Sequence, residues 1–278
     1  MSAISLLGVP HNDNSSFLKG PAEAPSLIRS ELNSDAYSVW SETGVNLGAS
    51  GVLIDHGDIA FDAASDPWDL IERNVARIVA SGEPLICLGG DHAVTHPILR
   101  GMRRQQQPSA NADIRPQGLT ILHIDAHADI YDAYQGNPRS HASPFARIME
   151  EKLCDRLIQV GLRTINDHHR DQFKRFGVEV IEMRHWRDDL RLDFKTPVYV
   201  SLDIDGLDPG YAPGVSHREP GGPSLRQVID LIHSIGQPIV GADIVEYNPR
   251  CDVANMTATV AAKLVREIAG MMVKTAGR

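Results

Sequence analysis

Acidic residues and histidines recur at short, regular intervals in three segments of the chain. The segments are Gly89-Gly90-Asp91-His92, Asp125-Ala126-His127-Ala128-Asp129 and Asp203-Ile204-Asp205-Gly206-Leu207-Asp208-Pro209. Spacing by two residues along an extended chain places Asp125, His127 and Asp129 on one side. The same spacing puts Asp203 beside Asp205. So many carboxylates in one place would repel one another unless cations neutralise them, which predicts a metal centre.

The expected ligands are four carboxylates and two imidazoles: His92, Asp125, His127, Asp129, Asp203 and Asp205. These are too many donors for one catalytic ion with an open position, but they suit two ions that share bridging carboxylates. The set is rich in oxygen, includes nitrogen and lacks sulfur, which favours two Mn(II) ions, with Ni, Co, Fe and Zn as alternatives. Each motif alone could be a solvated loop or a helix cap, and Asp208 before Pro209 suits a turn better than a ligand. The joint occurrence of the motifs favours a site.

Short β-branched runs alternate with longer amphipathic stretches along the chain. This pattern predicts an α/β fold with a mostly parallel sheet and helices on both of its faces. The expected strands are Ile4–Val9, Val52–Ile54, Leu85–Leu88, Leu119–Ile124, Leu157–Leu162, Val178–Ile181, Val198–Leu202 and Ile239–Ala242. Helices are expected at Trp68–Ala80 after Asp66-Pro67, at Leu225–Ile235 after the capping residue Ser224, and at Met256–Thr275.

Four of the expected strands run directly into candidate ligands. Leu85–Leu88 leads to His92, Leu119–Ile124 to Asp125, Val198–Leu202 to Asp203, and Ile239–Ala242 to Asp243-Ile244-Val245-Glu246. In an open parallel sheet, ligands bind outside the carboxyl ends of the strands. That edge of the sheet is therefore the expected site.

Composition sets the outer limits. A chain of 278 residues with 42% apolar content can bury a large core, and we expect a single domain over residues 1–278. A formal net charge of −9 with scattered basic residues argues against nucleic acid and membrane surfaces as partners. The first ten residues lack the basic start and the apolar length of a signal peptide, and the three cysteines fit a reducing compartment. The cytoplasm is the expected location.

The three motifs together resemble the ureohydrolase family of arginases and agmatinases, over essentially the whole chain. Plant-type arginases are the most similar subgroup, through Asn14–Leu18, Ser140–Ser143, Phe145–Glu150 and Pro213–His217. The resemblance implies a three-layer αβα sandwich with an eight-stranded parallel sheet. In it the third, eighth, seventh and fourth strands would lie side by side, and these are the strands that carry the candidate ligands.

The resemblance also implies how the ligands divide between two ions. The first ion would be held by His92, Asp125, Asp129 and Asp203, and the second by His127, Asp125, Asp203 and Asp205. A hydroxide shared by the two ions would attack the carbon of a guanidinium group.

Three catalytic residues are expected: Asp129, His141 and Glu246. By the resemblance, Glu246 pairs with the guanidinium nitrogens and orients the carbon, and His141 protonates the departing amine. On the residues alone, Glu246 would be an ordinary surface glutamate and His141 one loop histidine among 12.

The motifs say least about which residues contact the part of the substrate beyond its guanidino group. Asn166 stands where animal arginases have an aspartate that meets the α-amino group, and Val215-Ser216-His217 departs from the Thr-Gly-Thr of agmatinases. Asn137, Ser140 and His217 are, with Glu246, the expected substrate contacts. We expect hydrolysis of L-arginine to L-ornithine and urea, with agmatine or another small guanidino compound as the alternative substrate.

Two alternatives come from other functional classes, a single-metal deacetylase and a non-catalytic metal-binding scaffold. A single-metal deacetylase has no use for His92 or Asp129, and a silent scaffold would be expected to have lost His141 or Glu246. The resemblance also implies a homo-oligomer, a trimer or a hexamer.

Overall fold

One parallel sheet organises the chain. The computed structural model describes residues 3–105 and 118–276. Its strands are β1 (Ile4–Gly8), β2 (Leu53–Asp58), β3 (Leu85–Leu88), β4 (Thr120–Ile124), β5 (Arg156–Leu162), β6 (Glu179–Glu182), β7 (Val198–Asp203) and β8 (Ile239–Val245). They pair in the order β2-β1-β3-β8-β7-β4-β5-β6, and every pairing is parallel. This confirms the expected eight-stranded sheet with β3, β8, β7 and β4 side by side at its centre.

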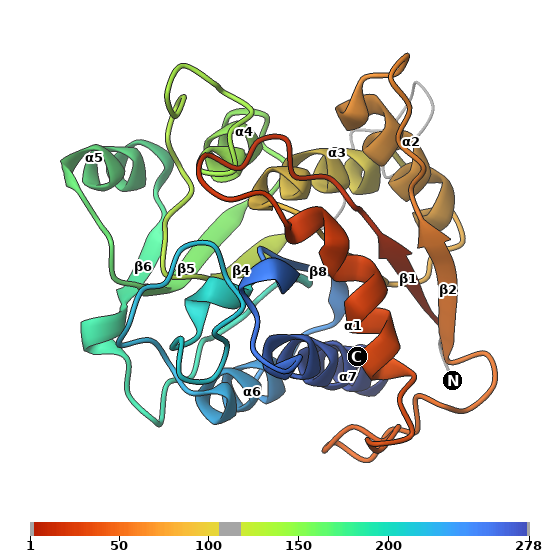
Figure 1. Ribbon diagram of the computed structural model, residues 1–278. Helices are drawn as coiled ribbons and strands as arrows, with labels where there is room; N and C mark the ends of the chain where they lie inside the picture. Colours follow the sequence, from red (N-terminus) through yellow and green to blue (C-terminus); the bar gives the residue numbers. More distant parts are fainter. Residues whose placement is uncertain (1–2, 106–117, 277–278) are drawn as a thin grey trace.

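Helices cover both faces of the sheet (Figure 1). They are α1 (Ala24–Leu32), α2 (Pro67–Val79), α3 (Thr95–Gln105), α4 (Pro144–Glu150), α5 (Asp167–Phe176), α6 (Leu225–His233) and α7 (Met256–Thr275). Side chains of β1 alternate between the two faces: Ile4 and Leu6 pack in the core with α1, α6 and α7, whereas Leu7 packs with α2, α3 and α4. The molecule is therefore a three-layer αβα sandwich, as expected.

Local sequence signals explain where the helices begin. The carboxylate of Asp66 accepts a hydrogen bond from the Trp68 backbone N–H at 2.8 Å, and Pro67 occupies the first position of α2. Ser224 and Gln227 form a capping box at the start of α6, which ends at His233, two residues before the expected Ile235. Within the described ranges, no helix combines the length and apolar character that a membrane span requires.

Strand ends are where the expectations were least accurate. β2 extends to Asp58 instead of ending at Ile54, because an exposed edge strand with polar residues gives no apolar pattern. We expected β8 to end at Ala242, but it continues to Val245, so Asp243 lies inside the strand. Its buried carboxylate accepts hydrogen bonds from the hydroxyls of Tyr199 at 2.6 Å and Ser201 at 2.7 Å. These bonds make a carboxylate tolerable inside the sheet.

Candidate metal centre and active site

The six expected ligands meet at the carboxyl ends of β3, β4 and β7. One group, in which each residue offers a ligand atom within 4.8 Å of the others, consists of His92, Asp125, Asp129 and Asp203. A second group consists of Asp125, His127 and Asp205, and a third, of His92, His123 and Asp125, overlaps the first. Asp125 belongs to all of them, so its carboxylate lies between the first and the second group.

The ligands converge through turns and not through strand alternation, so that part of the prediction was wrong. Asp205 lies in a short 3-10 helix (Ile204–Gly206), and Asp129 has a left-handed backbone with φ of 44°. The His127 backbone N–H donates to Asp125 Oδ1 at 2.7 Å, and that of Asp205 donates to Asp203 Oδ1 at 2.7 Å. Each tight turn thus fixes one carboxylate oxygen of its aspartate through a backbone N–H.

Hydrogen bonds fix the orientation of the His92 ring. Ser201 donates its proton to Asp243, so its oxygen must accept from His92 Nε2, which lies 3.1 Å away. His92 Nδ1 faces carboxylate oxygens of Asp125, Asp129 and Asp203 at 3.2, 2.9 and 3.1 Å. None of these oxygens is aligned to make a hydrogen bond with Nδ1. Ligand atoms surround an ion in this way, and a hydrogen bond to the other ring nitrogen, here that of Ser201 with His92 Nε2, sets the tautomer of a metal-binding histidine.

The donor atoms fit divalent cations. Ligand atoms about 2.1 Å from a shared ion and at right angles to one another lie about 3 Å apart, which matches the spacing around His92 Nδ1. Among the residues that the structure describes, buried Asp205 Oδ1 also has no hydrogen-bond partner. Burial, together with the neighbouring carboxylates, raises the pKa of Asp203 well above its ordinary value, and burial raises the pKa of Asp205 to about 7. Burial and like charge therefore oppose ionisation of these two carboxylates, and bound cations would relieve that cost.

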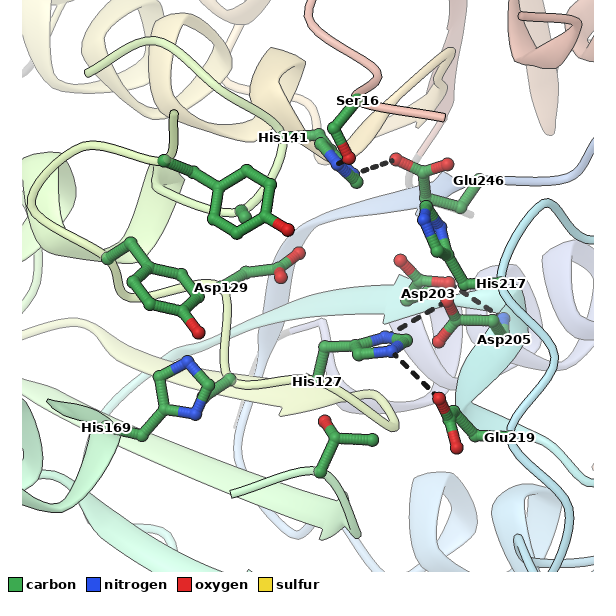
Figure 2. Close-up of a pocket in the computed structure, with 15 residues that line it drawn as sticks. Ser16, His127, Asp129, His141, His169, Asp203, Asp205, His217, Glu219 and Glu246 are labelled. Atoms are coloured by element: carbon green, nitrogen blue, oxygen red, sulfur yellow. Dashed lines mark hydrogen bonds and ion pairs between the residues drawn. The ribbon is translucent and has the colours of Figure 1, made fainter. Parts of the chain in front are cut away.

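His141 and Glu246 lie together beside the ligand groups (Figure 2). His141 Nδ1 is 3.3 Å from Glu246 Oε1, and the same oxygen accepts the His92 backbone N–H at 2.9 Å. Burial opposes protonation of His141, but the bond to Glu246 outweighs it and raises the pKa of His141 to about 9. A protonated imidazole, held by a buried carboxylate, thus faces the site at neutral pH.

A pocket of about 230 Å³ opens over these groups. It is lined by Ser16, His127, Ala128, Asp129, Tyr131, Tyr134, His141, Ala142, Thr164, His169, Asp203, Asp205, His217, Glu219 and Glu246. Ser16 lies 2.8 Å, Oγ to Nε2, from His141, and the rings of His141 and His217 stack with centroids 5.4 Å apart. His217 therefore lies where we expected a substrate contact.

Two other expected substrate contacts lie outside this lining. The Asn137 side chain donates to Asn14 Oδ1 at 3.1 Å, and Ser140 Oγ accepts the backbone N–H of Ala142 at 3.3 Å. Asn166 caps α5, bonds to the Tyr131 hydroxyl at 2.6 Å and is also absent from the lining. The substrate-binding role of Asn137 and Ser140 stays a prediction.

Sequence reasoning missed several residues of the pocket wall, namely Ser16, Tyr131, Tyr134, Thr164, His169 and Glu219. Ser16 falls in one of the plant-type phrases, which was a usable signal. The others carry no motif, because their place in the wall depends on how α5 and the loops after β4, β5 and β7 pack over the sheet.

Comparison with known proteins gives a consistent result. The sequence model of the arginase family matches residues 2–270. Arginase 1, mitochondrial, of Arabidopsis thaliana is 44% identical over 98% of this chain and 82% of its own length. The solved structure of arginase from Medicago truncatula superposes with a TM-score of 0.86 at 40% identity, covering 98% of this chain and 87% of that one. A guanidinopropionase of Pseudomonas aeruginosa is 34% identical over 99% of this chain and 88% of its own length.

Proposed function

The chain belongs to the arginase family and is a ureohydrolase, and on that premise we propose that it hydrolyses L-arginine to L-ornithine and urea. The observation that carries the proposal is the pair of ligand groups sharing Asp125, with Glu246 and His141 in the same pocket. Two cations, a guanidinium anchor and an acid are the parts that hydrolysis of a guanidino group needs. The choice of L-arginine is supported by the plant relatives, which are named arginases.

The residues have separate tasks in the proposed reaction. The Glu246 carboxylate binds the guanidinium group of the substrate and orients its carbon toward the ligand groups. When bound, divalent cations lower the pKa of water to near neutrality and so supply the nucleophile. His141 holds a proton at its ring and delivers it to the departing amine, which is a poor leaving group until protonated.

Metal identity, assembly, domain organisation and location complete the proposal. The oxygen-rich ligand set with two imidazoles supports two Mn(II) ions per subunit. We propose a homo-oligomer, a trimer or a hexamer, of single-domain subunits in the cytoplasm. Analytical ultracentrifugation would test the assembly, and metal analysis of protein purified without added metal would test the ions.

Urea release is the direct test of the activity. Protein loaded with Mn(II) would be offered L-arginine, agmatine, guanidinobutyrate, guanidinopropionate and guanidine side by side, with Asp203→Ala as the metal-site control. Dominant turnover of L-arginine that is lost in the control supports the proposal. Dominant turnover of another guanidine keeps the two-cation reaction and overturns the substrate, and guanidinopropionate is the specific rival because of the Pseudomonas relative.

His141→Asn tests the proposed acid. We expect kcat to fall by roughly 10²- to 10⁴-fold, the usual contribution of a positioned acid. Mn(II) content should not change, because His141 is not in either ligand group. His185→Asn, at an exposed histidine, is the matched control. A rise in KM with kcat unchanged would show that His141 only binds the substrate.

A further inference from the structure

Two uncharged polar side chains lie inside the sheet next to the metal centre. His123 on β4 and Gln159 on β5 are paired in register and have no exposed surface. Burying such groups is unfavourable unless they are hydrogen-bonded, so their hydrogen-bond partners indicate the role of the two side chains. Neither residue belongs to the pocket lining, and the proposed reaction gives neither a task.

The orientation of the Gln159 amide is fixed by a backbone carbonyl. Gln159 Nε2 lies 2.7 Å from the carbonyl oxygen of Ala128 and 2.9 Å from His123 Nδ1. A carbonyl oxygen can only accept, so the atom facing Ala128 must be the NH₂ group. Both amide protons are thereby used, and the buried Oε1 has no hydrogen-bond partner in the described part of the chain. The reverse orientation would place two oxygens against each other.

The amide in turn fixes the tautomer of His123. Its second proton points at Nδ1, which must therefore accept, so the ring proton of a neutral His123 is on Nε2. His123 Nε2 lies 2.8 Å from Asp125 Oδ2 and donates to it. Packing holds the ring in place, since the Phe145 ring lies against it with centroids 4.0 Å apart and His92 meets it edge-on at 4.9 Å.

Asp125 is the residue that all of the candidate ligand groups share. Its Oδ1 accepts a hydrogen bond from the His127 backbone N–H. Its Oδ2 accepts one from His123 Nε2–H, the tautomer that Gln159 imposes. Hydrogen bonds thus hold both oxygens of the shared carboxylate. The other Gln159 proton holds the carbonyl of Ala128, one residue before Asp129.

We propose that Gln159 is a positioning residue for the two-cation site: its amide imposes the Nε2–H tautomer of His123, which holds the shared carboxylate of Asp125 in its ligating orientation. This inference rests on the proposed two-cation function. The test must distinguish positioning from simple filling of the core, because any buried glutamine stabilises the fold through its hydrogen bonds. Filling alone predicts lost stability without a change in tautomer or in metal affinity.

Gln159→Leu and Gln159→Glu are the informative variants. Leucine removes the donor and leaves His123 free to adopt either tautomer. Glutamate presents an oxygen to Nδ1, which then takes the proton and leaves a lone pair of Nε2 facing Asp125. Gln172→Leu is the matched control, because Gln172 is also buried and also donates to a backbone carbonyl, that of Ile130 at 3.0 Å.

Two measurements are made on the full-length protein. The ¹⁵N shifts of the His123 ring, assigned with His123→Phe, report the tautomer in metal-free protein. Calorimetric titration with Mn(II) reports affinity. We expect Nε2–H in the unmodified protein, a mixed or reversed tautomer in the two variants, and a 10- to 100-fold loss of Mn(II) affinity, the usual effect of losing an outer-shell partner. Gln172→Leu should retain both the tautomer and the affinity.

Each failure has a separate meaning. An Nδ1–H tautomer in the unmodified protein overturns the inference even where the variants do not fold. So does Mn(II) affinity in Gln159→Leu equal to that of the unmodified protein. If the unmodified protein binds Mn(II) but releases no urea from any guanidine, the proposed function fails, and the tautomer and affinity comparisons still decide the role of Gln159.

Discussion

At the scale of single residues, the His141 and Glu246 pair places opposite charges in a buried part of the site. The pKa of His141 is raised from 6.5 to about 9, because the bond to Glu246 outweighs the effect of burial. A raised histidine pKa stabilises the fold fully below its unfolded value near 6.5 and loses that contribution as pH rises through about 9. The shift corresponds to roughly 3 kcal/mol.

Glu246→Gln should remove this dependence. In metal-free protein, we expect the variant to bring the pKa of His141 below about 9. We also expect it to flatten the fall in unfolding free energy between pH 6.5 and 9, the window set by the two pKa values of His141. NMR titration of the imidazole and urea denaturation across this pH range measure the two effects. An unchanged His141 titration in the variant would mean that Glu246 does not hold the proton.

The convergence of the candidate ligands could be predicted from sequence, and the residues of the pocket wall could not. His92, Asp125 and Asp203 follow recognisable strands, so their place at one edge was fixed by the parallel sheet alone. Tyr131 and His169 lie on segments whose path depends on long-range contacts, and nothing in their immediate sequence marks them.

At the scale of elements, Arg163 connects the end of β5 to the loop that follows β7. Its guanidinium donates to the backbone carbonyls of Gly161, Asp205, Gly206, Leu207 and Glu219. Only the planar, five-donor group of arginine can reach so many acceptors, and a lysine ammonium cannot replace it. The loop that carries Asp205 therefore depends on one side chain from another strand.

Arg163→Lys should destabilise the metal-free protein by about 3 kcal/mol, because several buried carbonyls lose a charged donor. It should also weaken binding of the cation at the Asp205 group more than at the His92 group. Urea denaturation and Mn(II) titration provide the measurements. Arg226→Lys, at an exposed pair with Glu42, is the control and should cost less than about 1 kcal/mol. Equal losses in the two variants would count against a special role for Arg163.

Gly90 is a second element-scale constraint, in the turn between β3 and His92. A Cβ at Gly90 would lie 1.8 Å from the carbonyl oxygen of His11, which is backbone and cannot move aside easily. Gly90→Ala should therefore displace the turn, lower stability by roughly 1–3 kcal/mol and reduce metal affinity. Gly236→Ala is the control, because a Cβ there has no atom of the described residues within 4 Å. Thermal melts and Mn(II) titration of both variants measure these effects. Equal melting temperatures and equal Mn(II) affinities in the two variants would contradict the prediction.

At the scale of the whole molecule, sequence reasoning predicted the layers and the strand order better than the strand ends. Alternating apolar runs and capping residues locate buried elements, and parallel pairing then fixes which ends share an edge. The end of β8 was predicted wrongly because an aspartate usually marks the end of a buried strand. Asp243 is nevertheless buried, and its carboxylate accepts hydrogen bonds from Tyr199 and Ser201. Such compensation comes from other strands and cannot be read from the local sequence.

Metal binding should control the stability of the whole fold. Without cations, burial and like charge keep the pKa of Asp203 well above its ordinary value and burial raises that of Asp205 to about 7. At these two groups the folded state then binds more protons than the unfolded state above about pH 4, so their contribution to the stability of the metal-free protein falls as pH rises toward 7. Cations replace these protons, and binding at 100 times Kd adds about 2.7 kcal/mol per site.

Asp203→Asn separates these two effects, because it removes a buried like charge while its side-chain oxygen can still accept the Asp205 backbone N–H. In the presence of a chelator at pH 7.5, we expect the variant to melt at a higher temperature than the unmodified protein. With saturating Mn(II) the order should reverse, since the variant loses a ligand of the His92 group. Asp208→Asn, in an exposed turn, should show the same Mn(II)-induced shift as the unmodified protein. The opposite result would be a lower melting temperature for Asp203→Asn than for the unmodified protein in the presence of the chelator. It would show that the Asp203 carboxylate stabilises the metal-free fold, and that the cluster does not need a cation for stability.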